Sequence, residues 1–62
     1  MHNVKDMVYH VDYPNLFGMV VSRSIARNRY HVVWNNRSNS MHIWSALKSA
    51  PVGTKLRFEN VQ

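Results

Sequence analysis

The chain has 62 residues, of which 45% are hydrophobic and 11% aromatic, and its eight Lys and Arg against three Asp and Glu give a net charge of +5. This length leaves room for one domain with one core and excludes a second domain or a deep substrate cleft. The apolar fraction excludes a disordered tail. We therefore expect a single folded domain over residues 1–62.

The chain contains no cysteine. This excludes disulfides and thiolate metal sites, and it favours a reducing, cytoplasmic compartment. The N-terminus has no uninterrupted apolar region or small-residue cleavage site, and no stretch approaches the roughly 20 apolar residues of a membrane span. We expect a protein that is neither exported by a signal peptide nor inserted in a membrane.

The first half of the chain predicts three strands. Residues 7–13 alternate with a period of two, and residues 17–22 form a β-branched run in which Gly18 predicts a bulge or a close backbone approach. Residues 24–28 connect this run to a third strand at 29–34, because Asn28 tolerates the left-handed conformation of a short turn. The aromatic face of that third strand is expected to face the core, and it carries Tyr30, Val32 and Trp34.

The second half predicts two more strands and a helical turn. After a polar turn at 35–40, residues 41–44 alternate, with Ile43 expected in the core and Trp44 outside. Residues 45–50 predict a short helical or 3-10 turn that Pro51 ends. Residues 54–59 alternate again, which predicts a last strand with Leu56 and Phe58 inward and Lys55, Arg57 and Glu59 outward. Without a crossover helix, the five strands must pair antiparallel.

Three stretches carry a resemblance to a known superfamily. Phe17 to Val21 is a glycine-then-valine strand, Tyr30 to Asn36 is an aromatic, β-branched strand ending in a turn, and Leu47 to Gly53 stands where a short 3-10 turn would precede a last strand. In this order they resemble the SH3-like barrels of the KOW and Tudor type. The resemblance implies an all-β fold, a small five-stranded antiparallel barrel. A self-contained basic chain of this size also looks like a small phage or prokaryotic accessory protein.

Arginines concentrate around the second connection, beside residues expected on outward faces. Guanidinium groups bind phosphates and an exposed aromatic ring stacks on a base, so this composition is typical of a nucleic-acid surface. The alternatives are a solvated turn, a tryptophan buried in a second small cluster, and a net charge that serves solubility alone. The candidate binding residues are Arg23, Arg27, Arg29, His31 and Trp44, with Lys55 and Arg57 extending the patch from the last strand.

Catalysis and metal binding find little support in the sequence. The acidic side chains are only three, Asp6, Asp12 and Glu59. The chain therefore offers few candidates for a general acid–base pair. No nucleophile elbow or glycine-rich phosphate loop is present. His10, His31 and His42 could converge on one face of a sheet, yet none of their spacings is that of a metal site. We expect no enzyme activity, no metal and no cofactor.

The sequence thus predicts a small basic binding module, acting as a monomer or homodimer. Its expected partner is nucleic acid, with DNA and RNA not distinguished. The alternative is a protein-interaction module, in which the basic domain docks on an acidic face of a larger enzyme or polymerase, because arginine beside an exposed aromatic also characterises protein interfaces.

Overall fold

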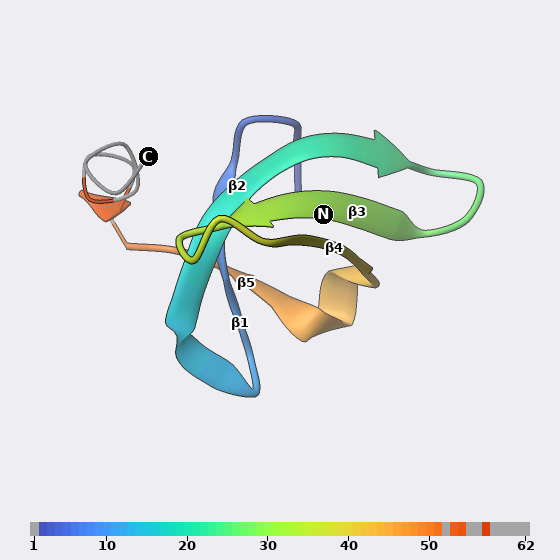
Figure 1. The fold of residues 1–62 in the computed structure, drawn as a ribbon. Helices are drawn as coiled ribbons and strands as arrows, with labels where there is room; N and C mark the ends of the chain where they lie inside the picture. Colours follow the sequence, from blue (N-terminus) through green and yellow to red (C-terminus); the bar gives the residue numbers. More distant parts are fainter. Residues whose placement is uncertain (1, 52, 55–56, 58–62) are drawn as a thin grey trace.

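The computed structural model describes residues 2–51, 53–54 and 57 of the chain. Five strands and one short helical turn follow each other as β1 (Met7–His10), β2 (Tyr13–Ser24), β3 (Arg29–Trp34), β4 (Asn39–His42), the 3-10 turn η1 (Trp44–Ala46) and β5 (Leu47–Ser49). The strands pair antiparallel in one curved sheet with the order β4-β3-β2-β1-β5 (Figure 1). The predicted all-β, five-stranded antiparallel fold with a helical turn before its last strand is confirmed.

The long strand β2 organises the sheet, because it pairs with both β1 and β3. Its register shifts between Val20 and Ser22, and such a bulge increases the local bend. The predicted close approach at Gly18 is present: a Cβ there would overlap the carbonyl of Val33 and lie 2.9 Å from the Cα of Trp34. The predicted left-handed turn residue, Asn28, has φ 54°. The glycine therefore permits the close approach of β2 to β3, and the asparagine stands in the turn that joins these two strands.

The core lies on the inner face of the sheet. Tyr30, Val32 and Trp34 of β3 are buried there, which confirms the predicted inward face of that strand. Each fully buried aliphatic side chain contributes about 1.5–3 kcal/mol relative to an exposed one. The cluster that these residues complete consists of Val8, Val20, Tyr30, Val32, Trp34 and Leu47, with Leu16 packed against it.

The predicted inward face of the fourth strand is wrong. Ile43 is 41% exposed and Met41 is 53% exposed, whereas Ser40 and His42 are partly buried. The reason is register: Tyr30 pairs with His42 and Val32 with Ser40, so the two polar side chains share the face of the core residues. Ser40 is tolerated there because the Trp34 indole needs an acceptor, and its Nε1 donates to Ser40 Oγ at 2.8 Å.

The last strand also differs from the prediction. It is Leu47–Ser49 and follows the 3-10 turn directly. The chain becomes extended there because Leu47 pairs with His10 and buries its side chain in the core. Of the predicted strand over 54–59, the two described residues are helical, and the N–H of Arg57 donates to the carbonyl of Gly53 at 3.2 Å. Lys55, Leu56, Phe58 and Glu59 lie outside the described residues.

The N-terminal residues cross the sheet near β2. The N–H of Lys5 donates to the carbonyl of Val20 at 2.7 Å, and the His2 ring packs edge-on against Tyr30 with Nε2 3.2 Å from the carbonyl of Leu47. This segment thus covers part of the core. Within the described part of the chain, no helix has the length and apolar character needed to cross a membrane.

Candidate nucleic-acid interface

The turn between β2 and β3 presents two of the predicted arginines. This hairpin reaches away from the rest of the sheet and ends in the turn (Figure 1). The turn is held by local hydrogen bonds, from the N–H of Arg27 to Ser24 Oγ at 3.3 Å and from the N–H of Asn28 to the carbonyl of Ile25 at 3.2 Å. Arg27 and Arg29 are both exposed. The turn therefore presents cationic side chains on a backbone that local hydrogen bonds hold in place.

The three predicted arginines play different structural parts. Arg29 Nη1 donates to the carbonyls of Arg27 and Asn28, at 3.1 and 3.2 Å, which uses only part of a guanidinium with five N–H donors. Arg23 Nη1 instead donates to the backbone O of His2 at 3.0 Å and to Asn3 Oδ1 at 2.9 Å. Arg23 fastens the N-terminal segment to β2, so its first role is structural.

His31 lies on the outer face of β3. It pairs with Ser22 on one side and Met41 on the other, and its Nε2 lies 3.0 Å from Asn39 Oδ1. The contact orients the imidazole along the surface. His31 and the exposed Met41 thus form a neighbouring pair on the outer face.

Trp44 is exposed, as predicted, although for a different reason. It begins η1, beyond the end of β4, and 52% of its surface is accessible. The pairing of Tyr30 with His42 ends the β3–β4 ladder, so Arg29 and Ile43 leave that ladder at the same end. The turn arginines and the exposed tryptophan therefore share one end of the sheet. We call this region the arginine end, and it consists of Arg27, Arg29, His31, Met41, Ile43 and Trp44.

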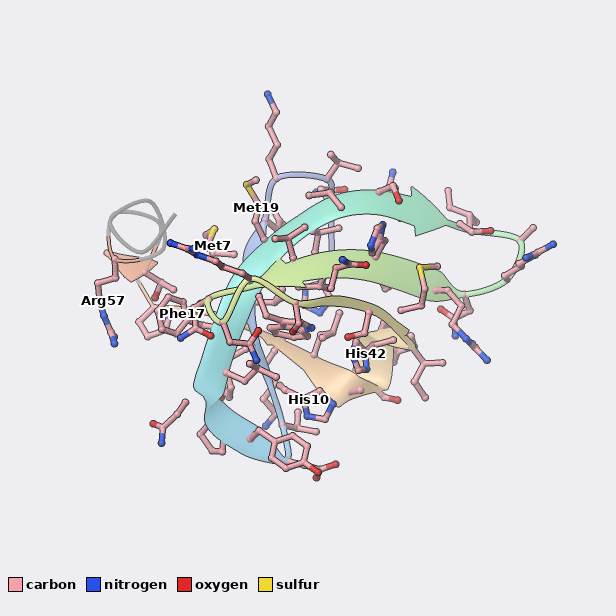
Figure 2. All side chains as sticks on the ribbon, viewed as in Figure 1. Met7, His10, Phe17, Met19, His42 and Arg57 are labelled. Carbon is pink, nitrogen blue, oxygen red and sulfur yellow. The ribbon has the colours of Figure 1, made fainter. Side chains whose placement is uncertain are left out.

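The predicted extension of this patch by the last strand is not observed. Arg57 lies over the ring of Phe17, with its guanidinium carbon 4.9 Å from the ring centroid. Phe17 is on the first half of β2, roughly 20 Å along the strand from the β2–β3 turn, and Figure 2 shows Arg57 and Phe17 together on the far side from that turn. Arg57 therefore belongs to another surface, and Lys55 lies outside the described residues.

Two histidines meet at a place that the sequence only partly indicated. The rings of His10 and His42 stand edge to face with centroids 4.9 Å apart, and both pack against Trp34 (Figure 2). His31, the third histidine considered with them, is on the outer face. Among the described residues, no three His, Cys, Asp or Glu side chains are placed to hold a metal ion. The sequence indicated that the histidines could converge, but it did not give the strand register that brings His10 and His42 together.

Hydrogen bonds orient both rings of this pair. The N–H of Asp12 donates to His10 Nδ1 at 3.1 Å, which leaves the His10 proton on Nε2. Ser40 Oγ accepts from the Trp34 indole and lies 2.6 Å from His42 Nε2, so the hydroxyl links the indole to the imidazole. Desolvation by burial lowers the pKa of His42 below its ordinary value, and positive charge on His10 lowers that pKa further. His42 is therefore more readily neutral than a free imidazole.

Comparison with known proteins leaves the fold and the site to be interpreted on physical grounds: no protein-family model, no curated protein and no solved structure matches the chain.

Proposed function

We propose that the protein is a non-enzymatic module that binds single-stranded nucleic acid through its arginine end. The observation that carries this proposal is the placement of exposed Trp44 at the same end of the sheet as Arg27 and Arg29. An exposed ring stacks on an unpaired base for about 1–3 kcal/mol, and the guanidinium groups bind the phosphates beside it. An unpaired strand offers both partners at once.

The charge distribution supports the same proposal. None of the six residues of the arginine end is acidic, and the carboxylate of Asp6 accepts a hydrogen bond from the N–H of Asn3 at 2.8 Å in the N-terminal turn. The chain as a whole carries +5. A positive end on a positive chain attracts a polyanion over a distance of about a Debye length, roughly 8–10 Å in physiological salt.

The topology supports membership in the SH3-like barrels. A four-strand meander followed by a 3-10 turn and a fifth strand is the order of elements that the sequence resemblance implied, although β5 is Leu47–Ser49 and not 54–59. Such folds carry many functions, so the fold itself does not select the ligand. With the absence of cysteine, we propose a cytoplasmic accessory protein of phage or prokaryotic type, which acts as a monomer or as a dimer through an edge strand.

The test is binding of fluorescent single-stranded DNA and RNA across a salt series, followed by anisotropy. We expect the logarithm of the affinity to fall linearly with the logarithm of salt concentration, and Arg27→Gln to reduce that slope by about 0.7 if one phosphate contact is lost. Arg37→Gln is the matched control, because Arg37 is also an exposed turn arginine but lies in the β3–β4 turn, at the other end of β3. No binding at low salt, or equal effects of the two substitutions, would contradict the proposal.

A second candidate is protein binding, favoured by the apolar part of the same end. Met41, Ile43 and Trp44 are all exposed, and Met, Trp and Arg are enriched in the centres of protein interfaces. This candidate predicts one saturable complex with an acidic protein, little dependence on salt, and no binding of generic oligonucleotides. The salt series above therefore separates the two functions.

A further inference from the structure

A row of three side chains crosses the outer face of the sheet on strands β2, β1 and β5. Phe17 of β2 pairs with Tyr9 of β1, and Tyr9 pairs with Lys48 of β5. Residues that pair across antiparallel strands project on the same face. The sheet thus carries two aromatic rings and an ammonium group in register, one on each of three neighbouring strands.

This row forms the floor of a groove with a volume of about 470 Å³. Apolar residues line its walls, with Val11 in the turn after β1, Pro14 near the start of β2, and Ala50 and Pro51 after β5. A volume of this size lies within the range of about 300–1,000 Å³ that is usual for small-molecule sites. Both prolines restrict the backbone around the groove, which favours a preformed shape.

The cations of the groove are placed at an aromatic surface. Arg57 lies over the Phe17 ring, which is buried, whereas Tyr9 is only partly buried and Lys48 is exposed. Among the described residues that line the groove, none is acidic. The groove therefore combines an accessible aromatic ring, apolar walls and two positive charges, which suits a flat apolar group joined to an anion.

We propose that this groove binds a nucleotide unit, with the base against Tyr9 and the prolines and the phosphate at Lys48 and Arg57. The proposal goes beyond the function assigned to the arginine end, because the two surfaces share no residue. A free nucleotide and a nucleotide within a strand present the same chemistry to the groove, and the experiment below distinguishes these two sources.

The experiment is a titration of the ¹⁵N-labelled protein with 5′-AMP, adenosine and a short oligoadenylate, followed by amide chemical shifts. We expect 5′-AMP to shift the amides of Tyr9, Lys48 and Ala50 and to bind more tightly than adenosine, because only AMP carries the phosphate. Oligoadenylate that shifts the same amides at lower concentration would make the strand the natural source. Equal or weaker binding per nucleotide would make the free nucleotide the source.

Two variants test the residues. Lys48→Gln changes an exposed side chain and is expected to weaken AMP binding about threefold or more while leaving adenosine binding unchanged. Tyr9→Leu keeps an apolar side chain but removes the stacking surface, and is expected to weaken both ligands about fivefold or more. Arg37→Gln, at an exposed turn arginine outside both surfaces, is the matched charge control and should leave AMP binding unchanged.

Three results would overturn the proposal. They are the absence of shifts in the groove at millimolar AMP, equal affinities for AMP and adenosine, and shifts in the groove that grow with protein concentration alone, which would make a second copy of the chain its occupant. Loss of strand binding at the arginine end, with AMP still bound in the groove, would refute the proposed function and leave this inference intact.

Discussion

The two tryptophans of this small sheet occupy opposite environments. Trp34 is 1% exposed, packs on the inner face and donates its indole N–H to Ser40, whereas Trp44 is 52% exposed at the start of η1. The same side chain therefore contributes to stability at one position and is free to contact a ligand at the other. The difference arises from register, because β3 points Trp34 at the core while the chain leaves the β3–β4 ladder before Trp44.

The largest effect is expected from Trp34→Ala. Removing this buried ring should cost about 3–5 kcal/mol, which is most of the stability of a domain this small. Urea denaturation followed by far-ultraviolet circular dichroism measures the loss. A cooperative transition within about 1 kcal/mol of the original protein would show that the core around Trp34 is not the main source of stability.

The histidine pair beside Trp34 predicts a pH dependence. The pKa of His42 is lower in the folded chain than its ordinary value of 6.5, so protonation favours the unfolded chain. Neutral His42 therefore contributes fully to the stability of the fold above pH 6.5. This contribution is lost as the pH falls below 6.5 and through the lower pKa of the folded chain. Thermal melts between neutral and mildly acidic pH should show a falling midpoint.

His42→Asn should reduce this pH dependence, and the same substitution at His31 provides the control outside the cluster. A melting midpoint that stays constant over the acidic range, or that falls equally in the original protein and the His42 variant, would contradict the arrangement of hydrogen bonds described for Ser40 and His42.

A smaller effect separates Arg23 from the other predicted arginines. Arg23→Ala removes the hydrogen bonds to His2 and Asn3 and should cost about 1 kcal/mol of stability, while strand binding changes less than in Arg27→Ala. Denaturation of both variants measures the loss of stability, and fluorescence anisotropy of both variants measures the change in strand binding. Binding loss in Arg23→Ala as large as in Arg27→Ala would place Arg23 in the interface itself.

The sequence predicted the parts of this molecule that local patterns determine. The alternation around Val32 placed Tyr30 and Trp34 in the core, Gly18 indicated a close approach, and Asn28 indicated a left-handed turn. It could not place Ile43, because the pattern of residues 41–44 fits either face and the choice depends on the pairing of Tyr30 with His42. The polar pair on the inner face is explained by Trp34: Ser40 accepts the indole N–H, and His42 contacts Ser40 and packs edge-on against the indole ring.

The same limit applies to the binding surfaces. Arg27, Arg29 and Trp44 could be named from composition, but their common end of the sheet follows from the β3–β4 register. The row of Phe17, Tyr9 and Lys48 joins two consecutive strands, β1 and β2, to β5, which is distant in the chain. The alternation of residues 7–13 placed Tyr9 on one face, and only the pairing with β5 showed that Lys48 shares it.

The most direct test of the account is Trp44→Ala, measured for both stability and strand binding. We expect the unfolding free energy to change by no more than about 0.5 kcal/mol and the affinity for single-stranded oligonucleotides to fall about fivefold or more, with Trp44→Phe retaining most of it. A folded Trp44→Ala variant that binds strands with the original affinity and salt dependence would contradict the proposed interface.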